Sequence, residues 1–239
     1  MNSLRVDEDF NFDIYITGSN AKLLSGELST YLAGRYIEFV VYPFSFKEFF
    51  EIIQEKNQEI KVKEAFQKYV KFGGMPFLHN LNYNYEASMQ YLQDLYASII
   101  LKDITQRNNI RDTDLLERII NYVIMNIGNT FSATSISKFF KNENRKVAIE
   151  TILNYIKACE EAFLIYRVAR NDLLGKKILN VNEKYYIADH GIREAIMENN
   201  QKNINQVLEN IVYFEMLRRG YNVKIGKVDN LEIDFVCKK

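Results

Sequence analysis

The amino end of the chain carries a strand-like alternation, then a helical pattern, then a second apolar run. Residues 14–17 (IYIT) alternate with the period of a strand, and Gly18 permits a sharp turn after them. Leucines at positions 23, 24 and 28 then recur at helical spacing. Residues 37–42 (IEFVVY) are rich in β-branched and aromatic side chains and stop at Pro43. We therefore expect a strand, a helix and a second, largely buried strand in this order.

The pattern from residue 46 to about residue 105 is helical. Ser45 and Glu48 have the spacing of a capping box, which predicts that a helix starts between them. Gly73 and Gly74 are expected to close a later helix, and Pro76 prevents its continuation. A helix cap and a helix stop are sufficient to explain these two motifs, without any catalytic or binding role.

Three helices and two strands are predicted in the middle of the chain. The amphipathic patterns cover residues 115–127, 132–140 and 146–162, and the strand patterns cover residues 162–170 and 178–188. Three helices followed by a β-hairpin are typical of a winged helix.

The C-terminal residues predict one helix and two strands. The helix runs from Leu208 to Arg219 and ends at Gly220, and the strand patterns cover residues 221–225 and 231–237. The whole chain is therefore expected to be mostly α with small β parts, in the α+β class.

Composition places the chain among ordinary globular proteins. Of its 239 residues, 47% are hydrophobic and 26% are charged, and 31 basic residues balance 31 acidic ones. The chain as a whole therefore offers no basic field that would attract DNA. Cys159 and Cys237 match no metal spacing, so we expect two unpaired thiols in a reducing compartment. A charged start (MNSLRVDEDF) and the lack of a long apolar run predict a cytoplasmic protein without membrane contact.

The order of motifs in residues 13–50 resembles part of a known ATPase core. A strand ending in Thr-Gly-Ser-Asn, a helix, Gly34-Arg35, a second strand and Pro-Phe-Ser-Phe-Lys-Glu follow one another here. This order is similar to the second half of the core in a prokaryotic AAA+ family. In that family the core is followed by a helical lid, a winged helix and a region that resembles PD-(D/E)XK nucleases. The resemblance implies four parts: a half core (1–43), a lid (44–108), a winged helix (109–200) and a truncated nuclease-like domain (201–239).

The resemblance also assigns candidate nucleotide-sensing residues. Ser19 and Asn20 match the strand end that contacts the terminal phosphate or the attacking water, and Arg35 matches an arginine directed at a phosphate or a neighbouring subunit. Taken singly, Ser-Asn after a strand is a common helix cap, and an arginine before a strand is commonly a solvated charge.

The nucleotide-binding half of such a core is not found in this sequence. Residues 18–22 (GSNAK) have neither the spacing of a phosphate-binding loop nor its closing Ser or Thr, and no apolar run ending in Asp-Glu precedes Asn2. We therefore expect a fragment of an AAA+ ATPase that neither binds nor hydrolyses ATP alone and needs no cofactor. The intact family implies ATP, Mg²⁺ and a possible homo-oligomer.

The predicted winged helix supports a second hypothesis, a standalone module that binds DNA or a protein partner. Its third helix would lie in a major groove. The DNA-contact candidates are Asn144, Arg145 and Lys146 at the start of that helix, with Lys141 nearby. Nearby glutamates, including Glu150, dilute this charge, so both kinds of partner stay open.

Two further motifs match the family after the predicted wing. They are Lys-Tyr-Tyr at 184–186 and the Asp189-x-Gly191-x-x-Arg193 pattern. Asp189 is expected to cap the following helix, and Gly191 is expected to allow close packing. His79 and His190 have no partners at metal or triad spacing, which favours structural roles.

The C-terminal carboxylates resemble the start of a nuclease site. Glu209 matches the helix position, and Asp234, with Glu232 beside it, matches the strand position. Such a site holds a divalent cation and needs a second acidic residue and a lysine on the next strand. That strand is not found before Lys239, so we predict no nuclease activity, no catalytic residue and no metal site in this chain.

Overall fold

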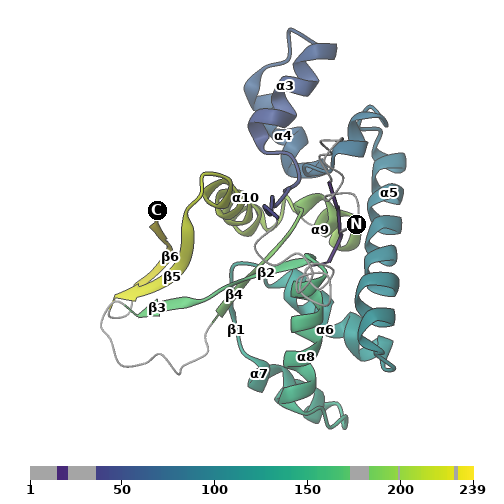
Figure 1. Ribbon diagram of the computed structural model, residues 1–239, viewed down its shortest axis with the longest axis vertical. Coiled ribbons are helices and arrows are strands. Elements are labelled where there is room, and N and C mark those ends of the chain that lie inside the picture. Colours follow the sequence, from purple (N-terminus) through teal and green to yellow (C-terminus); the bar gives the residue numbers. More distant parts are fainter. Residues whose placement is uncertain (1–14, 21–35, 173–182, 199, 229–230) are drawn as a thin grey trace, which may run out of the picture.

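Helices make up most of the described chain, and two small sheets lie among them (Figure 1). The computed structural model describes residues 15–20, 36–172, 183–198, 200–228 and 231–239. This composition confirms the predicted α+β class. Within these ranges no helix is both long and apolar enough to cross a bilayer. Cys159 is buried and Cys237 is exposed, and neither forms a disulfide, as expected.

Two short helices form a small aromatic layer at the upper end of the molecule (Figure 1). They are α3 (Phe46–Lys56) and α4 (Val62–Phe72). The predicted capping box is confirmed, because the Ser45 amide donates to Glu48 at 2.7 Å and the Glu48 amide donates to the Ser45 hydroxyl at 3.2 Å. The two helices bury Phe49, Ile53, Ile60, Ala65 and Tyr69 between them.

The predicted stop at the double glycine is also confirmed. α4 ends at Phe72, Gly73 takes a φ of 77°, and Pro76 begins a 3-10 turn, η2 (Pro76–His79). A long helix then runs along one side of the molecule as α5 (Tyr85–Ser98) and continues as a π-helical segment, η3 (Ile99–Gln106).

The middle of the chain forms three helices around a three-stranded sheet. The elements are α6 (Thr113–Met125), β1 (Thr130–Phe131), α7 (Ala133–Asn142), α8 (Ile149–Glu161), β2 (Ile165–Val168) and β4 (Glu183–Ile187). β4 lies between β1 and β2 and is antiparallel to both. The largest core packs here, because the apolar faces of α5, α6 and α8 meet one side of this sheet.

The C-terminal part forms a second sheet beside a long helix. Its elements are α9 (His190–Met197), α10 (Ile204–Arg218), β5 (Asn222–Val228) and β6 (Leu231–Lys238). β5 and β6 are antiparallel, and β3 (Arg170–Asp172) joins β5 in a parallel pair. Sequence analysis assigned residues 162–170 to one strand. The chain instead passes from β2 in the first sheet to β3 in the second, which ties the two sheets together.

The prediction of a largely buried strand at residues 37–42 is wrong for this structure. Residues 36–41 are exposed and form no helix or strand in the described part of the molecule. A single strand has no stability without neighbours, however strong its β propensity. Residues 15–17 also lie outside any strand, whereas Ile14, the predicted helix at 23–28 and Arg35 fall outside the described residues.

Candidate functional site

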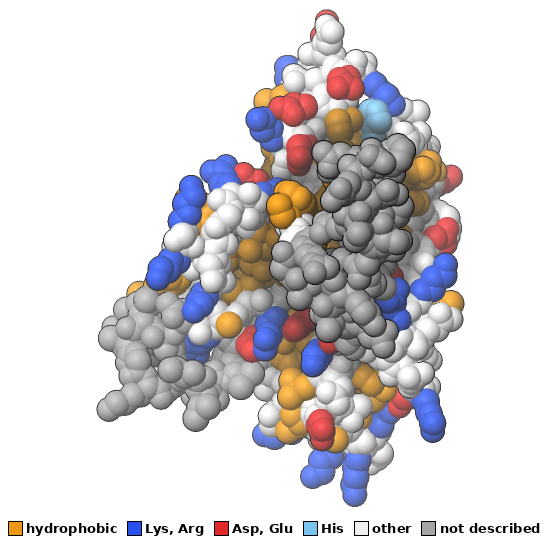
Figure 2. Space-filling view, in the orientation of Figure 1, with side chains coloured by type: hydrophobic (Ala, Val, Ile, Leu, Met, Phe, Trp, Pro, Cys, Tyr) orange, Lys and Arg blue, Asp and Glu red, His pale blue; other side chains and the backbone are white. Residues whose placement is uncertain are grey.

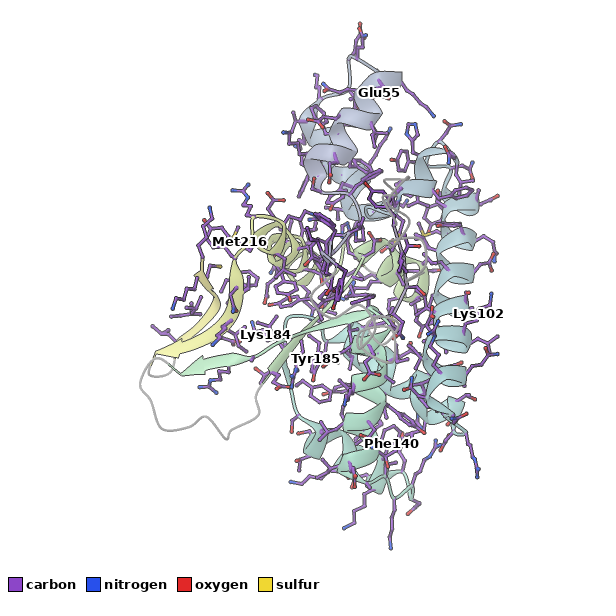
Figure 3. All side chains as sticks on the ribbon, viewed as in Figure 1. Glu55, Lys102, Phe140, Lys184, Tyr185 and Met216 are labelled. Atoms are coloured by element: carbon purple, nitrogen blue, oxygen red, sulfur yellow. The ribbon has the colours of Figure 1, made fainter. Side chains whose placement is uncertain are left out.

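A single lysine gathers the three carboxylates that sequence analysis singled out. The side chain of Lys184, on β4, is only 3% exposed and lies between β4 and the C-terminal sheet (Figure 3). Its ammonium nitrogen is 3.0 Å from Glu209 on α10. It is 2.9 Å from both Glu232 and Asp234 on β6. The sequence motifs predicted the carboxylates but not that Lys184 would lie among them.

The alternation of β4 explains which side chains reach this cluster. Lys184 and Tyr186 point to the same side of the strand, and the Tyr186 hydroxyl donates a 2.6 Å hydrogen bond to Glu209. Tyr185 points to the other side, into the large helical core. The Lys-Tyr-Tyr motif therefore places Tyr185 in the large helical core and Tyr186 in the smaller core beside α10 and β5. Its lysine lies among the three carboxylates.

Glu209 is followed by a residue that fixes the helix to the same strand. The Asn210 side chain accepts from the Ile187 amide at 2.9 Å and donates to the Ile187 carbonyl at 3.0 Å. This pair imitates the backbone pairing of a neighbouring strand at the end of β4. α10 thus holds its carboxylate in register with Lys184.

The electrostatics of the cluster keep Lys184 charged. Burial lowers the pKa of its ammonium, but hydrogen bonds to Asp234, Glu232 and Glu209 raise it by more, so the net pKa is above the usual value. A protonated lysine neutralises carboxylates but does not act as a general base. Within the described ranges, no group of three or more His, Cys, Asp or Glu residues is placed to hold a metal ion.

A second polar junction joins the double glycine to the start of α9. Asp189 accepts from the Gly74 amide at 2.6 Å and from the Gly191 amide at 2.8 Å. It is the N-cap of α9, as predicted. A Cβ on Gly73 would lie 2.1 Å from the Asp189 carboxylate, and one on Gly191 would lie 2.0 Å from the Phe72 carbonyl oxygen. The double-glycine motif and the Asp189-x-Gly191 motif are therefore in direct contact, and this close packing explains Gly73 and Gly191.

Buried polar groups extend this junction. His190 lies 2.6 Å from the Tyr69 carbonyl, and burial lowers the pKa of its imidazole. The Arg193 guanidinium donates to Asn200 at 2.6 Å, and the Asn200 amide donates to the His190 carbonyl at 2.7 Å. The same guanidinium donates to the Ile124 carbonyl at 3.2 Å. These contacts fit a structural role for His190.

The chain enters the helical part through a clamped segment, Tyr42–Phe44. Arg218 donates to the Pro43 carbonyl at 2.7 Å, and its guanidinium lies 5.8 Å from the Tyr42 ring centre. The Tyr69 hydroxyl donates to the Phe44 carbonyl at 2.8 Å. Helices α4 and α10 thus hold this segment from two sides.

Of the predicted nucleotide-sensing residues, the described part of the chain includes Ser19 and Asn20. The Ser19 hydroxyl donates to Asp103 of the π-helical segment at 3.2 Å. Asp103 also pairs with Arg107 at 3.2 Å. Asn20 is buried, and Arg35 falls outside the described residues.

The four DNA-contact candidates do meet at the turn between α7 and α8. Arg145, however, is engaged by acidic residues, 2.7 Å from Asp112 and 2.5 Å from Asp114. Lys141 and Lys146 are exposed and form no ion pair in the described structure. Basic side chains project from the lower end of the molecule, where this turn lies (Figure 2). Asn144 adopts a φ of 60° and forms the turn itself.

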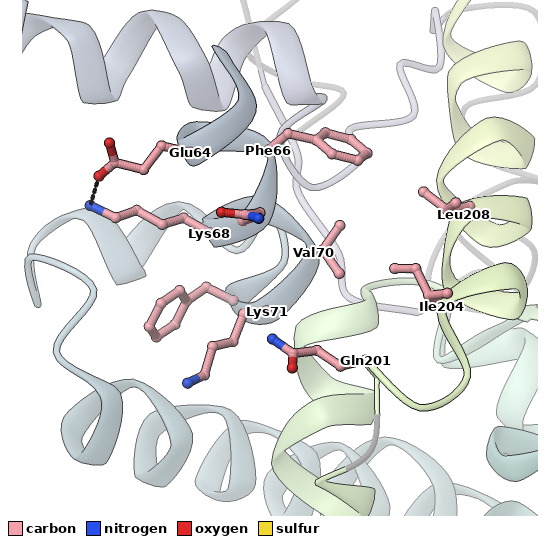
Figure 4. Close-up of a pocket in the computed structure, with 10 residues that line it drawn as sticks. Glu64, Phe66, Lys68, Val70, Lys71, Gln201, Ile204 and Leu208 are labelled. Carbon is pink, nitrogen blue, oxygen red and sulfur yellow. Dashed lines mark ion pairs between the residues drawn. The ribbon is translucent and has the colours of Figure 1, made fainter. Parts of the chain in front are cut away.

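The structure also contains a groove that sequence analysis did not predict. It lies between α4 and α10, has a volume of about 750 Å³, and is lined by Phe66, Val70, Ile204 and Leu208 (Figure 4). An exposed pair between Glu64 and Lys68, 3.8 Å apart, lies at its rim. Apolar lining positions at spacings of three or four on each helix were its only sequence signal.

Comparison with known proteins gives this architecture a family. The family model described as a domain of unknown function (DUF8612) matches residues 63–203, and an AAA domain model matches residues 3–50. An uncharacterised protein of Haemophilus influenzae is 40% identical over all of this chain and 59% of its own length. An uncharacterised protein of Methanocaldococcus jannaschii is 30% identical over 95% of this chain and 53% of its own length.

The chain spans little more than half the length of the curated relatives it matches. No solved structure matches it. The model match over residues 63–203 covers more than half of the sequence. The chain therefore belongs to the family of the domain of unknown function DUF8612, with an amino-terminal segment similar to an AAA domain.

Proposed function

We propose that this chain is the part of an AAA-type ATPase that responds to bound nucleotide, rather than the part that binds it. The observation that carries the proposal is the clamped segment Tyr42–Phe44. The AAA domain match covers residues 3–50, so the clamped segment lies within the AAA-like residues. The segment is fixed to both α4 and α10.

The contacts of Tyr42 describe how such a response would travel. Its ring packs 5.8 Å from Phe214 on α10 and 6.2 Å from Tyr166 on β2. A shift of the AAA-like segment would therefore act on the helix that carries Glu209 and on the sheet that carries Lys184. Packed side chains transmit such shifts because cores deform little.

The sequence supports the first half of the proposal, that the chain does not bind ATP by itself. Tight triphosphate binding needs a glycine-rich loop whose backbone amides and lysine surround the phosphates. No such motif occurs in residues 1–239. ATP and Mg²⁺ belong to the whole protein in this proposal.

Two measurements test the proposal. Calorimetry of this chain with Mg²⁺-ATP is expected to show no binding, whereas the full-length Haemophilus influenzae relative is expected to bind. Hydrogen exchange of that relative should change on ATP addition at the residues aligned with Tyr42–Phe44 and α10. Micromolar ATP affinity of this chain alone, or unchanged exchange at those residues in the ATP-bound relative, would contradict the proposal.

We propose, as a second function, that α6 to β4 form a winged helix whose partner is a protein. The order of helices and strands, and the central place of β4 between β1 and β2, support the winged-helix assignment. The exposed side of α8 presents Ile149 and Leu153, which are 43% and 42% exposed, next to Glu150. Apolar and acidic side chains there favour a protein surface over phosphates.

The ion pairs of Arg145 also favour a protein partner over DNA. An arginine guanidinium suits phosphate best among the candidate side chains, but that of Arg145 is already paired with Asp112 and Asp114. A gel-shift series with duplex DNA at physiological salt tests this second function. We expect affinity no better than the roughly 100 μM seen for the weakest non-specific binders. Tighter binding that Lys141→Glu with Lys146→Glu removes, but Glu209→Ala does not, would identify DNA as the partner instead.

A further inference from the structure

The groove between α4 and α10 has an apolar lining and two charged residues of opposite sign. Its apolar lining comes from both helices and consists of Phe66, Val70, Ile204 and Leu208. Glu64 and Lys71 also line it, seven positions apart on α4. Seven residues span about 10.5 Å of a helix, or about two turns, and lie on one helix face. The groove therefore presents an acid toward one end and a base toward the other.

Neither of these two charges has a strong partner in the described structure. The Glu64 carboxylate pairs with Lys68 at 3.8 Å, and both side chains are exposed. Exposed pairs one helical turn apart contribute little to stability. The Lys71 ammonium lies 4.1 Å from the centre of the Tyr85 ring and forms no ion pair among the described residues. Both charges are therefore available to a helix that enters the groove.

Helix α8 carries a matching pattern on its exposed side. Ile149 and Leu153 are 43% and 42% exposed. Glu150 and Lys157 are also exposed, lie seven positions apart, and form no ion pair in the part of the chain that the structure describes. Leu153 follows Glu150 by three positions and precedes Lys157 by four, so the three side chains are neighbours on one helix face. We call Ile149, Glu150, Leu153 and Lys157 the α8 ridge.

The charges of the ridge and the groove match when the two helices are antiparallel. On both α4 and α8 the acid precedes the base by about two turns. Antiparallel packing therefore places Glu150 opposite Lys71. The same arrangement places Lys157 opposite Glu64, with Leu153 near the middle of the apolar lining. Parallel packing would place like charges opposite each other, so the charge pattern favours one orientation.

The α8 ridge is far from the groove of its own chain. Helix α4 lies toward the upper end of the molecule, and α8 lies in its lower part (Figure 1). The buried side of α8, with Ile152, Ile156 and Cys159, belongs to the largest core, which fixes the helix there. A ridge that fits this groove must therefore come from another molecule.

We propose that the α8 ridge binds the groove between α4 and α10 of a second copy of this chain. The inference rests on the proposed winged helix with a protein partner, and it identifies that partner as another copy. Because the ridge and the groove are different surfaces, each copy can supply a helix and receive one. A contact about two turns long is small, so the association is weak and depends on protein concentration.

Sedimentation equilibrium of the whole 239-residue chain tests this contact. We expect the average mass to rise with protein concentration. Leu153→Asp should weaken the association by about a hundredfold, because the new charge would be buried in the apolar lining. Leu101→Asp is the matched control, since this leucine of η3 is 53% exposed and lies outside both the ridge and the groove. A chain that is still monomeric at roughly 1 mM, or equal effects of the two variants, would overturn the proposal.

A charge exchange tests the antiparallel register. Lys71→Glu places two acids opposite each other and should weaken the association by about tenfold. Adding Glu150→Lys to the same chain restores a pair of opposite charges between copies and should recover most of the affinity. Lys63→Glu, at an exposed position of α4 outside the groove lining, should have no effect.

The rescue also separates contact from folding. Glu150 is far from Lys71 within one chain, so its exchange cannot repair a folding defect caused at Lys71. Urea unfolding of each variant provides an independent check of the fold. A double variant that associates as weakly as Lys71→Glu alone would reject this register and, with it, the proposed contact.

The inference and the proposed winged-helix function fail in different ways. Tight DNA binding that Lys141→Glu with Lys146→Glu removes would reject the proposed function, while association through Leu153 would still establish the contact between copies. A monomeric chain that binds DNA only weakly would retain the protein partner and reject a second copy as that partner.

Discussion

The amide of Gly74 donates a 2.6 Å hydrogen bond to Asp189 across 115 residues of sequence. This bond joins the end of α4 to the start of α9, and the second Asp189 oxygen accepts from Gly191 at 2.8 Å within α9. One carboxylate thereby caps α9 and fixes the turn after α4, where the Gly74 carbonyl accepts from the Phe44 amide of the clamped segment at 2.8 Å. The relationship therefore links α4, α9 and Phe44 of the clamped segment through one turn.

We expect Asp189→Ala to lower the free energy of unfolding by about 3 kcal/mol. Two buried backbone amides lose a charged acceptor, and each such loss costs about 1–3 kcal/mol. Urea unfolding measures the change. Asp94→Ala is the matched control, since Asp94 is exposed and, among the described residues, accepts only from Gln90, one helical turn away. A similar loss in both variants would contradict the role given to Asp189.

His190 predicts a pH dependence of stability. Burial lowers the pKa of its imidazole below the usual 6.5, although nearby Asp189 acts in the opposite direction. The unfolded chain therefore binds the proton more readily, and stability falls as pH decreases below about 6.5. His190→Gln retains a donor for the Tyr69 carbonyl and should reduce this slope between pH 7.5 and pH 5.

The comparison is made by urea unfolding of both proteins at several pH values. His79→Gln serves as the control, because His79 lies partly exposed on η2. If His190→Gln unfolded with the same pH slope as the unchanged chain, another group would control the acid sensitivity.

Local features of the fold were predictable because their causes are local. The capping box at Ser45 and the helix stop at Gly73 each depend on residues within a few positions. Residues 37–42 failed as a buried strand because burial depends on neighbours, which propensity does not supply. The crossing of the chain into β3 was missed for the same reason, since pairing with β5 brings together residues more than 50 positions apart.

The residues of the candidate site were also predictable only in part. The sequence indicated Glu209, Glu232 and Asp234, yet it gave no reason to place Lys184 among them, because three elements must fold before they meet. Arg145 was indicated as a DNA contact from its position in a turn. Its pairing with Asp112 and Asp114 depends on how α6 packs beside that turn, and spacing does not report this.

We expect Lys184→Met to lower the free energy of unfolding by about 2 kcal/mol at neutral pH. The substitution keeps an unbranched side chain but leaves three carboxylates without their shared cation. Losing one partner of a buried pair costs about 3–5 kcal/mol. The expected loss is smaller because Glu232 and Asp234 are 53% and 60% exposed. Urea unfolding at neutral pH measures it.

A rescue experiment separates charge from packing in this cluster. Adding Glu232→Gln and Asp234→Asn to Lys184→Met removes two of the negative charges and should recover more than half of the lost stability. The pKa of Lys184 is raised in the folded chain, so the contribution of its charge is full below the usual value of 10.5 and declines only above it. A rescue that recovers nothing would show that lost packing, not charge, explains the change.

Arg218→Met is expected to loosen the clamped segment without unfolding the molecule. It removes a charged hydrogen bond to the Pro43 carbonyl and a cation–π contact with Tyr42, together worth about 2 kcal/mol. Amides of residues 42–44 should then exchange roughly tenfold to thirtyfold faster, since each 1.4 kcal/mol is a factor of ten. Arg219→Met is the neighbouring control, because within the described structure Arg219 pairs only with Glu215 on the surface of the same helix, and such pairs contribute little. Faster exchange in both variants, or in neither, would mean that α10 does not hold the segment through Arg218, and the route from the AAA-like residues to Glu209 would lose its first contact.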